Sequence, residues 1–157
     1  MAMEIEGEEL ISASNDRVWA ALNDPEVLRA CIPGCESLTA TSPTGMSAIV
    51  SVKIGPIKAR FTGEITLNDI NPPNSYRIEG QGKGGIAGFA KGGAFVELTT
   101  EGANTTKLTY KVRADVGGKL AQLGSRLILS TARKLTGEFF GNFDRVVGQA
   151  ETITDVS

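Results

Sequence analysis

Residues 107–128, KLTYKVRADVGGKLAQLGSRLI, contain the change of pattern that decides the fold. The first ten of them alternate between apolar and polar side chains, with Leu108 and Tyr110 on the apolar side. Alternation of this kind predicts a strand of an antiparallel sheet that has a single buried face. After Gly117-Gly118 the apolar residues recur at helical spacing, so a helix is predicted to follow the strand directly.

The helical pattern after Gly118 is long, at roughly eight turns, whereas an average helix has about three. Its apolar stripe consists of Leu120, Leu123, Leu127, Ile128, Leu135, Phe139, Phe143 and Val146. We therefore expect one long amphipathic helix that ends near Gln149. One domain is predicted over residues 3–149, and residues 150–157 are expected to form a frayed tail.

Toward the N-terminus, a mixed apolar and acidic segment at residues 4–11 is predicted to be the first strand. Two short helices are expected next. Ser14 is a good cap for the first, and Asp24-Pro25 is typical of the start of the second, which ends at Ile32-Pro33-Gly34. Alternating patterns then predict further strands at residues 46–54, 60–70, 76–82, 94–100 and 107–116.

These elements predict an α+β fold: a curved antiparallel sheet of about seven strands wraps around the long C-terminal helix, with two short helices after strand 1. Small residues are frequent on the predicted inner face of the sheet, among them Gly63, Gly80, Gly82, Ala94 and Ala114. A solid core would place larger side chains there, so we favour a ligand-sized cavity between helix and sheet. The alternative is that small residues permit close approach of the helix.

The composition excludes several classes of function. The chain has 157 residues, enough for one domain with a core. Sixteen basic residues against eighteen acidic ones give no electrostatic reason to expect nucleic acid as a partner. Histidine is absent, which excludes histidine-based catalysis and histidine-ligated metals, so we expect a protein that is not an enzyme. Without a signal peptide or an apolar span, it is expected to be cytoplasmic.

The glycine-rich stretch 82–94, GKGGIAGFAKGGA, follows Gly80 and matches the dinucleotide pattern G-x-G-x-x-G. That motif requires a helix after it, but a strand pattern follows here, so nucleotide binding is not expected. Glycines inside strands are instead typical of close backbone approach, which favours a hairpin. Ile86 and Phe89 would lie at its tip, either as part of a lid or without a role.

Lys119, Arg126 and Arg133 recur every seven residues along the predicted helix, with Lys134 beside them. This basic row is either a solvated face or a docking surface for an acidic partner or an anionic membrane. Tyr76 and Tyr110 are predicted to face inward. Their hydroxyl groups need a partner, for which a backbone carbonyl is slightly favoured over a polar group of a ligand.

Several segments resemble the G-subunit family of carbon monoxide dehydrogenase over about residues 3–148. They are DPEVLRACIPGCESL (24–38), GPIKARFTG (55–63), GKGGIAGFAKG (82–92) and VGGKLAQLGSR (116–126), together with Pro72-Pro73, Tyr76 and the pair Phe139-Phe140. The resemblance implies a helix-grip fold of the START-like superfamily, whose members hold apolar ligands between sheet and helix. It also implies an accessory protein of molybdenum hydroxylases of the carbon monoxide dehydrogenase type, linked to the membrane or the respiratory chain.

Our leading hypothesis is a non-enzymatic carrier of an apolar small molecule, either an isoprenoid quinone (menaquinone or ubiquinone) or a lipid. Its partners would be molybdenum hydroxylase subunits, with peripheral contact at the inner face of the cytoplasmic membrane. The expected lining comprises Phe61, Ile65, Ile78, Phe89, Val96, Tyr110, Val112, Leu123, Leu127, Leu135 and Phe139. One alternative is an assembly or recruitment factor that acts through Lys119, Arg126, Arg133 and Lys134. A weaker alternative is a cyclase-like enzyme on the same fold.

Overall fold

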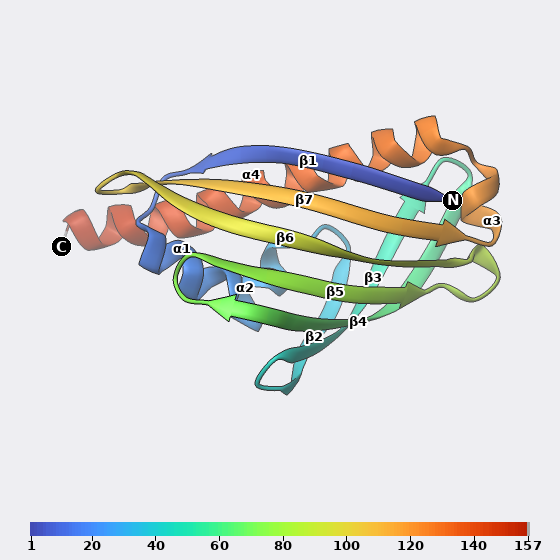
Figure 1. The fold of residues 1–157 in the computed structure, drawn as a ribbon, viewed down its shortest axis with the longest axis horizontal. Helices are drawn as coiled ribbons and strands as arrows, with labels where there is room; N and C mark the ends of the chain where they lie inside the picture. Colours follow the sequence, from blue (N-terminus) through green and yellow to red (C-terminus); the bar gives the residue numbers. More distant parts are fainter. Residues whose placement is uncertain (157) are drawn as a thin grey trace.

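The computed structural model describes residues 1–156, with side chains described up to Gly148. Within this range one antiparallel sheet has the strand order β1-β7-β6-β5-β4-β3-β2, and the long helix α4 crosses its concave side (Figure 1). This confirms the predicted α+β fold. The strands are β1 (Ala2–Ile11), β2 (Cys35–Ser42), β3 (Gly45–Ile54), β4 (Ile57–Asn71), β5 (Ser75–Lys83), β6 (Phe89–Gly102) and β7 (Thr105–Gly117). The helices are α1 (Asn15–Leu22), α2 (Pro25–Cys31), the 3-10 turn η1 (Gly85–Ala87), α3 (Lys119–Gln122) and α4 (Ser125–Val156).

The two short helices begin at the predicted caps. The Ser14 hydroxyl accepts a hydrogen bond from the backbone N–H of Arg17 (3.5 Å), and the Asp24 carboxylate accepts one from the N–H of Glu26 (2.9 Å). Each bond satisfies one of the N–H groups that a helix start leaves without a partner. α1 and α2 then lie together at one end of the sheet, beneath the C-terminal half of α4 (Figure 1).

The prediction of one continuous helix after Gly118 is wrong. α3 ends after a single turn, and Gly124 has a φ of +91°, outside the helical region, before α4 begins at Ser125. Glycine adopts this conformation at little cost, so the helical backbone can break at Gly124. The apolar spacing nevertheless continues across the break. The prediction of a frayed tail over residues 150–157 falls where side chains are not described, and the helix bounds extend to Val156.

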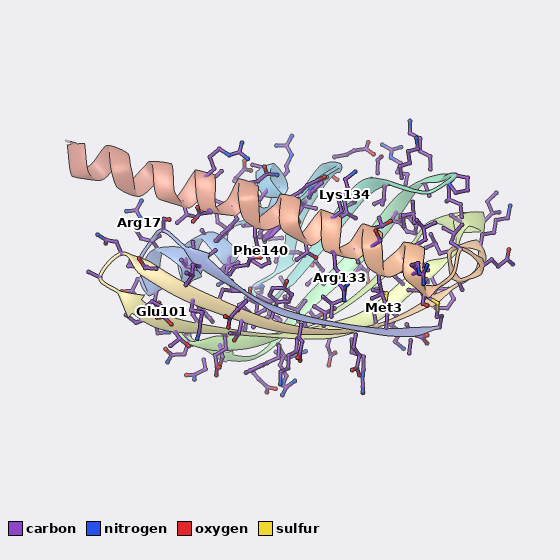
Figure 2. All side chains as sticks on the ribbon, turned by 90° about the horizontal axis from the view of Figure 1, so that it is seen from above. Met3, Arg17, Glu101, Arg133, Lys134 and Phe140 are labelled. Carbon is purple, nitrogen blue, oxygen red and sulfur yellow. The ribbon has the colours of Figure 1, made fainter. Side chains whose placement is uncertain are left out.

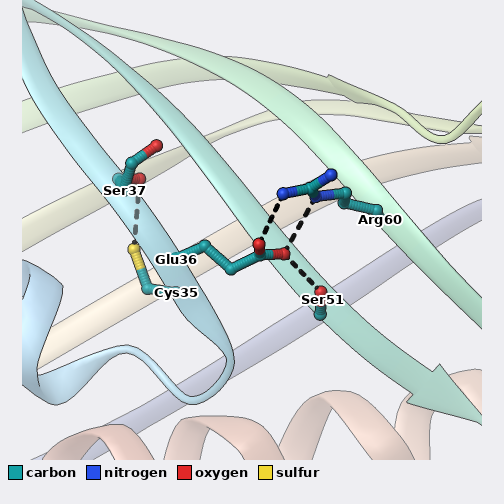
Figure 3. A network of polar contacts seen from close by, with 5 residues as sticks. All are labelled: Cys35, Glu36, Ser37, Ser51 and Arg60. Atoms are coloured by element: carbon teal, nitrogen blue, oxygen red, sulfur yellow. Dashed lines mark hydrogen bonds and ion pairs between the residues drawn. The ribbon is translucent and has the colours of Figure 1, made fainter.

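The sequence pattern gave no sign of β2. Its residues 35–42 show no clear alternation, and Leu38 is its one buried side chain. Polar contacts on the outer face hold this edge strand in place (Figure 3). The Glu36 carboxylate accepts hydrogen bonds from Arg60 on β4 (2.6 and 3.0 Å) and from the Ser51 hydroxyl on β3 (2.6 Å). The network thus ties three neighbouring strands together.

The glycine-rich stretch forms the predicted hairpin between β5 and β6, with η1 at its tip. Gly88 has a φ of +121°, and a side chain there would collide with the carbonyl of Gly117. Gly118 is equally restricted, because a Cβ on it would lie 2.5 Å from the Cα of Gly88. Glycine at residues 88 and 118 therefore allows the hairpin tip to pack directly against the β7–α3 junction, as the strand context predicted.

Buried side chains form three separate clusters instead of one continuous core. The largest lies at the α1–α2 end and includes Ile11, Leu108 and Phe143. A second, around Leu38 and Met46, packs under α2, and a third, around Leu120 and Ile128, lies at the α3 end. The three clusters therefore do not form one continuous apolar layer between α4 and the sheet.

Candidate functional site

The inner face of the sheet is almost bare at its centre. The strand register aligns Gly80 of β5, Gly92 of β6 and Ala114 of β7 in one row across the sheet. A neighbouring row aligns Gly63 and Gly82 on β4 and β5. These residues include four of the small inner-face residues that the sequence predicted, and they leave the sheet centre without large side chains.

At Gly92 the absence of a side chain is obligatory. An added Cβ would collide with the backbone carbonyl of Arg113 and lie 2.8 Å from the Cα of Ala114 on β7. No real Cβ makes contacts this short, so residue 92 has to be glycine for β6 and β7 to pair in this way. Gly80 is less constrained, because its nearest neighbour would be the carbonyl of Glu64 at 3.3 Å.

The opposite wall is the sheet-facing side of α4. Its apolar residues Leu127, Leu135 and Phe139 are half-buried, as are Ile65, Ile78 and Val112 on the sheet. The backbone of α4 approaches α2 and β1 most closely, so it lies nearer to the β1 edge than to the central strands. In the described part of the chain, Val112, Leu127 and Leu135 join none of the three buried clusters.

Toward the α1–α2 end, aromatic side chains pack between α4 and the sheet. The Tyr110 ring stacks on Phe140 of α4 (centroids 5.4 Å apart), and Phe140 packs edge-on against Phe139 (5.1 Å). Figure 2 shows Phe140 between α4 and the sheet. Burial raises the pKa of Tyr110, and the nearby Glu9 carboxylate raises it further. Tyr110 was predicted to face inward and does so, whereas Phe140 was not among the expected lining residues.

Tyr76 is the most deeply buried polar aromatic residue of this region, with 4% of its surface exposed. Its ring meets Trp19 of α1 edge-on, with 5.3 Å between centroids. Within residues 1–148 its hydroxyl forms no hydrogen bond to another residue, so the favoured backbone carbonyl partner is not present. Burial accordingly raises the pKa of Tyr76.

The other expected lining residues are spread along the whole interface. Val96 is buried in the large cluster near α1 and α2, whereas Phe61 and Leu123 pack against the cluster at the α3 end. Leu127 points at the β3–β4 turn, since a Cβ on Gly55 would lie 2.8 Å from its Cδ2. Ile65, Ile78 and Phe139 also pack against the large cluster, so the predicted set does not form a single pocket.

Phe89 does not belong to the lining. It precedes Ala90, which faces inward, so its side chain lies on the outer face, where its ring rests on Gly117. It is 44% exposed. The sequence was misleading because Phe89 opens its strand after a turn, where alternation cannot be counted from one side. Met3 and Ile5 of β1 take inward positions that the sequence prediction missed.

The expected basic row is divided by the break at Gly124. Lys119 lies on α3, while Arg126 and Arg133 share a face of α4. Figure 2 shows Arg133 and Lys134 on different sides of α4. All four side chains are exposed, and none forms a salt bridge within residues 1–148.

A separate open hollow of about 490 Å³ lies on the outer face of the sheet, over β4, β5 and β6. Its walls carry charged and polar side chains, among them Glu64, Glu79 and Lys91, so it differs in chemistry from the apolar inner face. Among the described residues, no group of three or more cysteine or acidic side chains is placed to hold a metal ion. No helix in the described range is both long and apolar enough to cross a membrane.

Comparison with solved structures identifies the fold. A START superfamily protein from Mycobacterium smegmatis is 12% identical and superposes with a TM-score of 0.73, over 94% of this chain and 98% of that one. The Zhui aromatase/cyclase from Streptomyces sp. R1128 is 13% identical, with a TM-score of 0.66, over 96% of this chain and 94% of that one. The chain thus has the helix-grip fold of the START superfamily.

The sequence identifies the particular family. The family model for the G subunit of carbon monoxide dehydrogenase (CoxG) matches residues 7–148, so the chain belongs to the CoxG family. A conserved protein from Geobacillus kaustophilus is 30% identical, with a TM-score of 0.89, over 94% of this chain and 97% of that one. Comparison with curated protein sequences gave no match.

Proposed function

We propose that this protein is a non-enzymatic accessory protein that binds an apolar ligand between α4 and the inner face of the sheet. The observation that supports it best is the middle of that interface. There, Leu135 of α4 and Val112 of β7 are half-buried and belong to none of the three clusters within the described residues, and Val112 lies next to the row formed by Gly80, Gly92 and Ala114. Apolar side chains that belong to no closed cluster gain stability when a ligand covers them.

The size of that gain is sufficient for useful affinity. Burying about 300 Å² of apolar ligand surface contributes about 7 kcal/mol before the cost of association is subtracted. An empty, dry cavity of ligand size would be costly by comparison, since lost packing amounts to about 24 cal/mol per Å³. The space is therefore expected to be filled by a ligand or open to water.

Membership of the CoxG family supports the choice of partner enzyme. The family takes its name from carbon monoxide dehydrogenase, and we propose that this chain serves a molybdenum hydroxylase of that type. Such an enzyme has to pass electrons to a membrane pool, so an isoprenoid quinone, menaquinone or ubiquinone, is the proposed ligand, with a lipid as the other candidate. The buried Tyr76 hydroxyl has no hydrogen-bond partner among residues 1–148, and a quinone carbonyl that reached it would supply one.

Native mass spectrometry with organic extraction of the co-purifying molecule tests the proposal. Ala114→Phe fills the bare centre of the inner face, and Lys111→Phe adds the same ring on the exposed outer face of the same strand. We expect a stoichiometric quinone or lipid in the unaltered protein and in Lys111→Phe, and its loss in Ala114→Phe. A protein that is empty and also takes up no added quinone would refute ligand binding.

A second candidate is an assembly or recruitment factor that acts through its surface. It is favoured by the exposed cations Lys119, Arg126, Arg133 and Lys134, which lack acidic partners among the described side chains. Charge reversal at these positions should abolish recruitment of the hydroxylase and spare ligand binding if this candidate is correct. A cyclase-like activity has less support, because Glu9 is the only acidic side chain that the described strand register turns to the inner face.

A further inference from the structure

One end of the molecule carries an exposed apolar tip. Ile86, in the 3-10 turn between β5 and β6, is 85% exposed, the highest value among the large apolar side chains up to residue 148. Phe89 follows it and is 44% exposed. Figure 1 shows this hairpin at the same end as α3 and the N-terminus. A large aliphatic side chain on a projecting turn has no core to support and is a candidate contact.

Several separate elements at this end of the molecule carry basic side chains (Figure 1). They are Lys53 and Lys58 at the β3–β4 turn, Lys83 at the end of β5, Lys119 at the start of α3, and Arg126 in the first turn of α4. All five are exposed, and none forms a salt bridge within the described residues. We call Ile86, Phe89 and these five cations the tip surface.

The five cations lie at one end because the elements that carry them pack together. Ile54 and Ile57, beside the β3–β4 turn, pack against the cluster that contains Leu120 of α3 and Ile128 of α4. The turn η1 contacts α3 and β4. The tip surface is therefore fixed by the third core cluster and does not depend on a mobile segment.

Charge at this end is not cancelled by neighbouring acids. Asp115 is nearby, but it bonds to the amino group of Met1 (3.0 Å) and lies opposite Lys91 in the β6–β7 register. Exposed acids gather at the other end of the molecule, where Asp16, Asp24 and Glu26 lie on or beside α1 and α2, and Figure 2 shows Glu101 far from Met3. A chain with a formal charge of −2 thus presents one basic end.

We propose that the tip surface docks on an anionic phospholipid bilayer, with Ile86 inserted among the headgroups and the five cations against lipid phosphates. An apolar side chain at the apex of a convex turn, with lysines around it, matches the layered chemistry of that surface. We favour a bilayer over an acidic protein partner because Ile86, 85% exposed on a turn, can enter a headgroup layer without a matching pocket. The proposal rests on the proposed function, because docking there would bring the helix–sheet space close to a bilayer that holds apolar ligands.

Vesicle co-sedimentation tests the docking surface. We expect the protein to bind phosphatidylcholine–phosphatidylglycerol vesicles, to bind pure phosphatidylcholine vesicles much more weakly, and to be released by salt. Each lysine near an anionic surface contributes about fivefold to partitioning. Neutralising Lys83 and Lys119 together by Lys→Gln should therefore lower the partition coefficient about 25-fold.

Matched variants separate insertion from general charge effects. Ile86→Asp should abolish sedimentation with anionic vesicles, while Leu10→Asp should not, although Leu10 is 65% exposed at the opposite end. Lys111→Gln, an exposed lysine on the outer face away from the tip, is the control for the lysine variants. Circular dichroism checks that each variant is folded, which is expected because all these side chains are exposed.

Two results would overturn the proposal: equal binding to both vesicle types, or equal loss with Leu10→Asp and Ile86→Asp. Absence of vesicle binding, together with capture by an acidic polypeptide such as polyglutamate, would overturn it in favour of a protein partner. Ligand extraction from the same preparation keeps the two proposals apart. A protein that holds a quinone but ignores vesicles refutes the docking surface alone. One that binds vesicles yet neither carries nor takes up a ligand refutes the carrier alone.

Discussion

The Tyr110 ring lies over Gly7, its partner on the adjacent strand, and its hydroxyl oxygen would be 2.6 Å from a Cβ placed there. The missing side chain on β1 is thus what allows Tyr110 to lie flat and stack on Phe140 of α4. The stack joins α4 to the β1–β7 edge of the sheet. A glycine in a strand otherwise weakens it, so its presence here has a packing reason.

Gly7→Val should therefore destabilise the protein by about 1–3 kcal/mol, because the new side chain displaces Tyr110 from Phe140. Urea unfolding measures the change. Glu6→Val introduces the same residue at an exposed position one residue earlier and should change stability by less than about 0.5 kcal/mol. Equal stability of the two variants would show that the stack is dispensable.

Gly88→Ala should cost about 1–3 kcal/mol of stability, since residue 88 combines a φ of +121° with a collision at the carbonyl of Gly117. Gly85→Ala is the matched control in the same hairpin. It has a φ of +61° but no atom within 4 Å of an added Cβ, so it should cost only about 1 kcal/mol. Thermal unfolding of both variants distinguishes backbone strain from close approach, and a larger loss at residue 85 would contradict this account.

Tyr76 should make the protein sensitive to alkaline pH. Burial raises its pKa in the folded state above the ordinary value of 10.0, so the unfolded chain loses this proton first. Stability is therefore full below pH 10 and falls as the pH rises above it. Tyr76→Phe should reduce this loss and, by removing an unpaired buried hydroxyl, raise stability at neutral pH by about 1 kcal/mol. Urea unfolding at neutral and alkaline pH measures both effects; a steeper alkaline loss in the variant would be contrary to the expected sign.

Glu36 should give the opposite pH dependence. The hydrogen bonds from Arg60, followed by that from Ser51, lower the pKa of Glu36 below its ordinary value of 4.5. The stabilising contribution is present above that value and is lost as the pH falls through the folded-state pKa. Arg60→Gln should return the pKa of Glu36 toward its ordinary value. Carboxyl NMR titration of the two proteins measures the shift, and an unchanged titration would mean that the network does not persist in solution.

The fold could be predicted because its main elements carry regular patterns. β7 alternates without interruption, and α4 keeps one apolar stripe, so sheet, helix and their order followed directly. β2 was missed because eight residues with one buried side chain carry too little pattern to count. The break at Gly124 was missed because the apolar spacing runs on through it while the backbone departs from helical geometry.

The candidate site was less predictable, because the face on which a side chain lies depends on register. Ile78 and Val112 sit well inside strands, and alternation alone placed them correctly on the inner face. Phe89 begins a strand after a turn and was assigned to the wrong face. The five cations of the tip surface come from five elements, and the packing of the β3–β4 turn against α3 and α4 brings most of them to one end. Separation along the chain hides such a grouping from the sequence.

The pairing of β1 with β7 has a consequence for biosynthesis. Ala2 pairs with Asp115, so β1 is synthesised more than a hundred residues before the strand with which it pairs. The five hairpin pairings from β2 to β7 can form in order as each strand emerges, whereas the addition of β1 at the edge of the sheet comes late and involves the longest loop. During that interval β1 is an unpaired strand with an apolar face, which makes it the segment most in need of protection from aggregation.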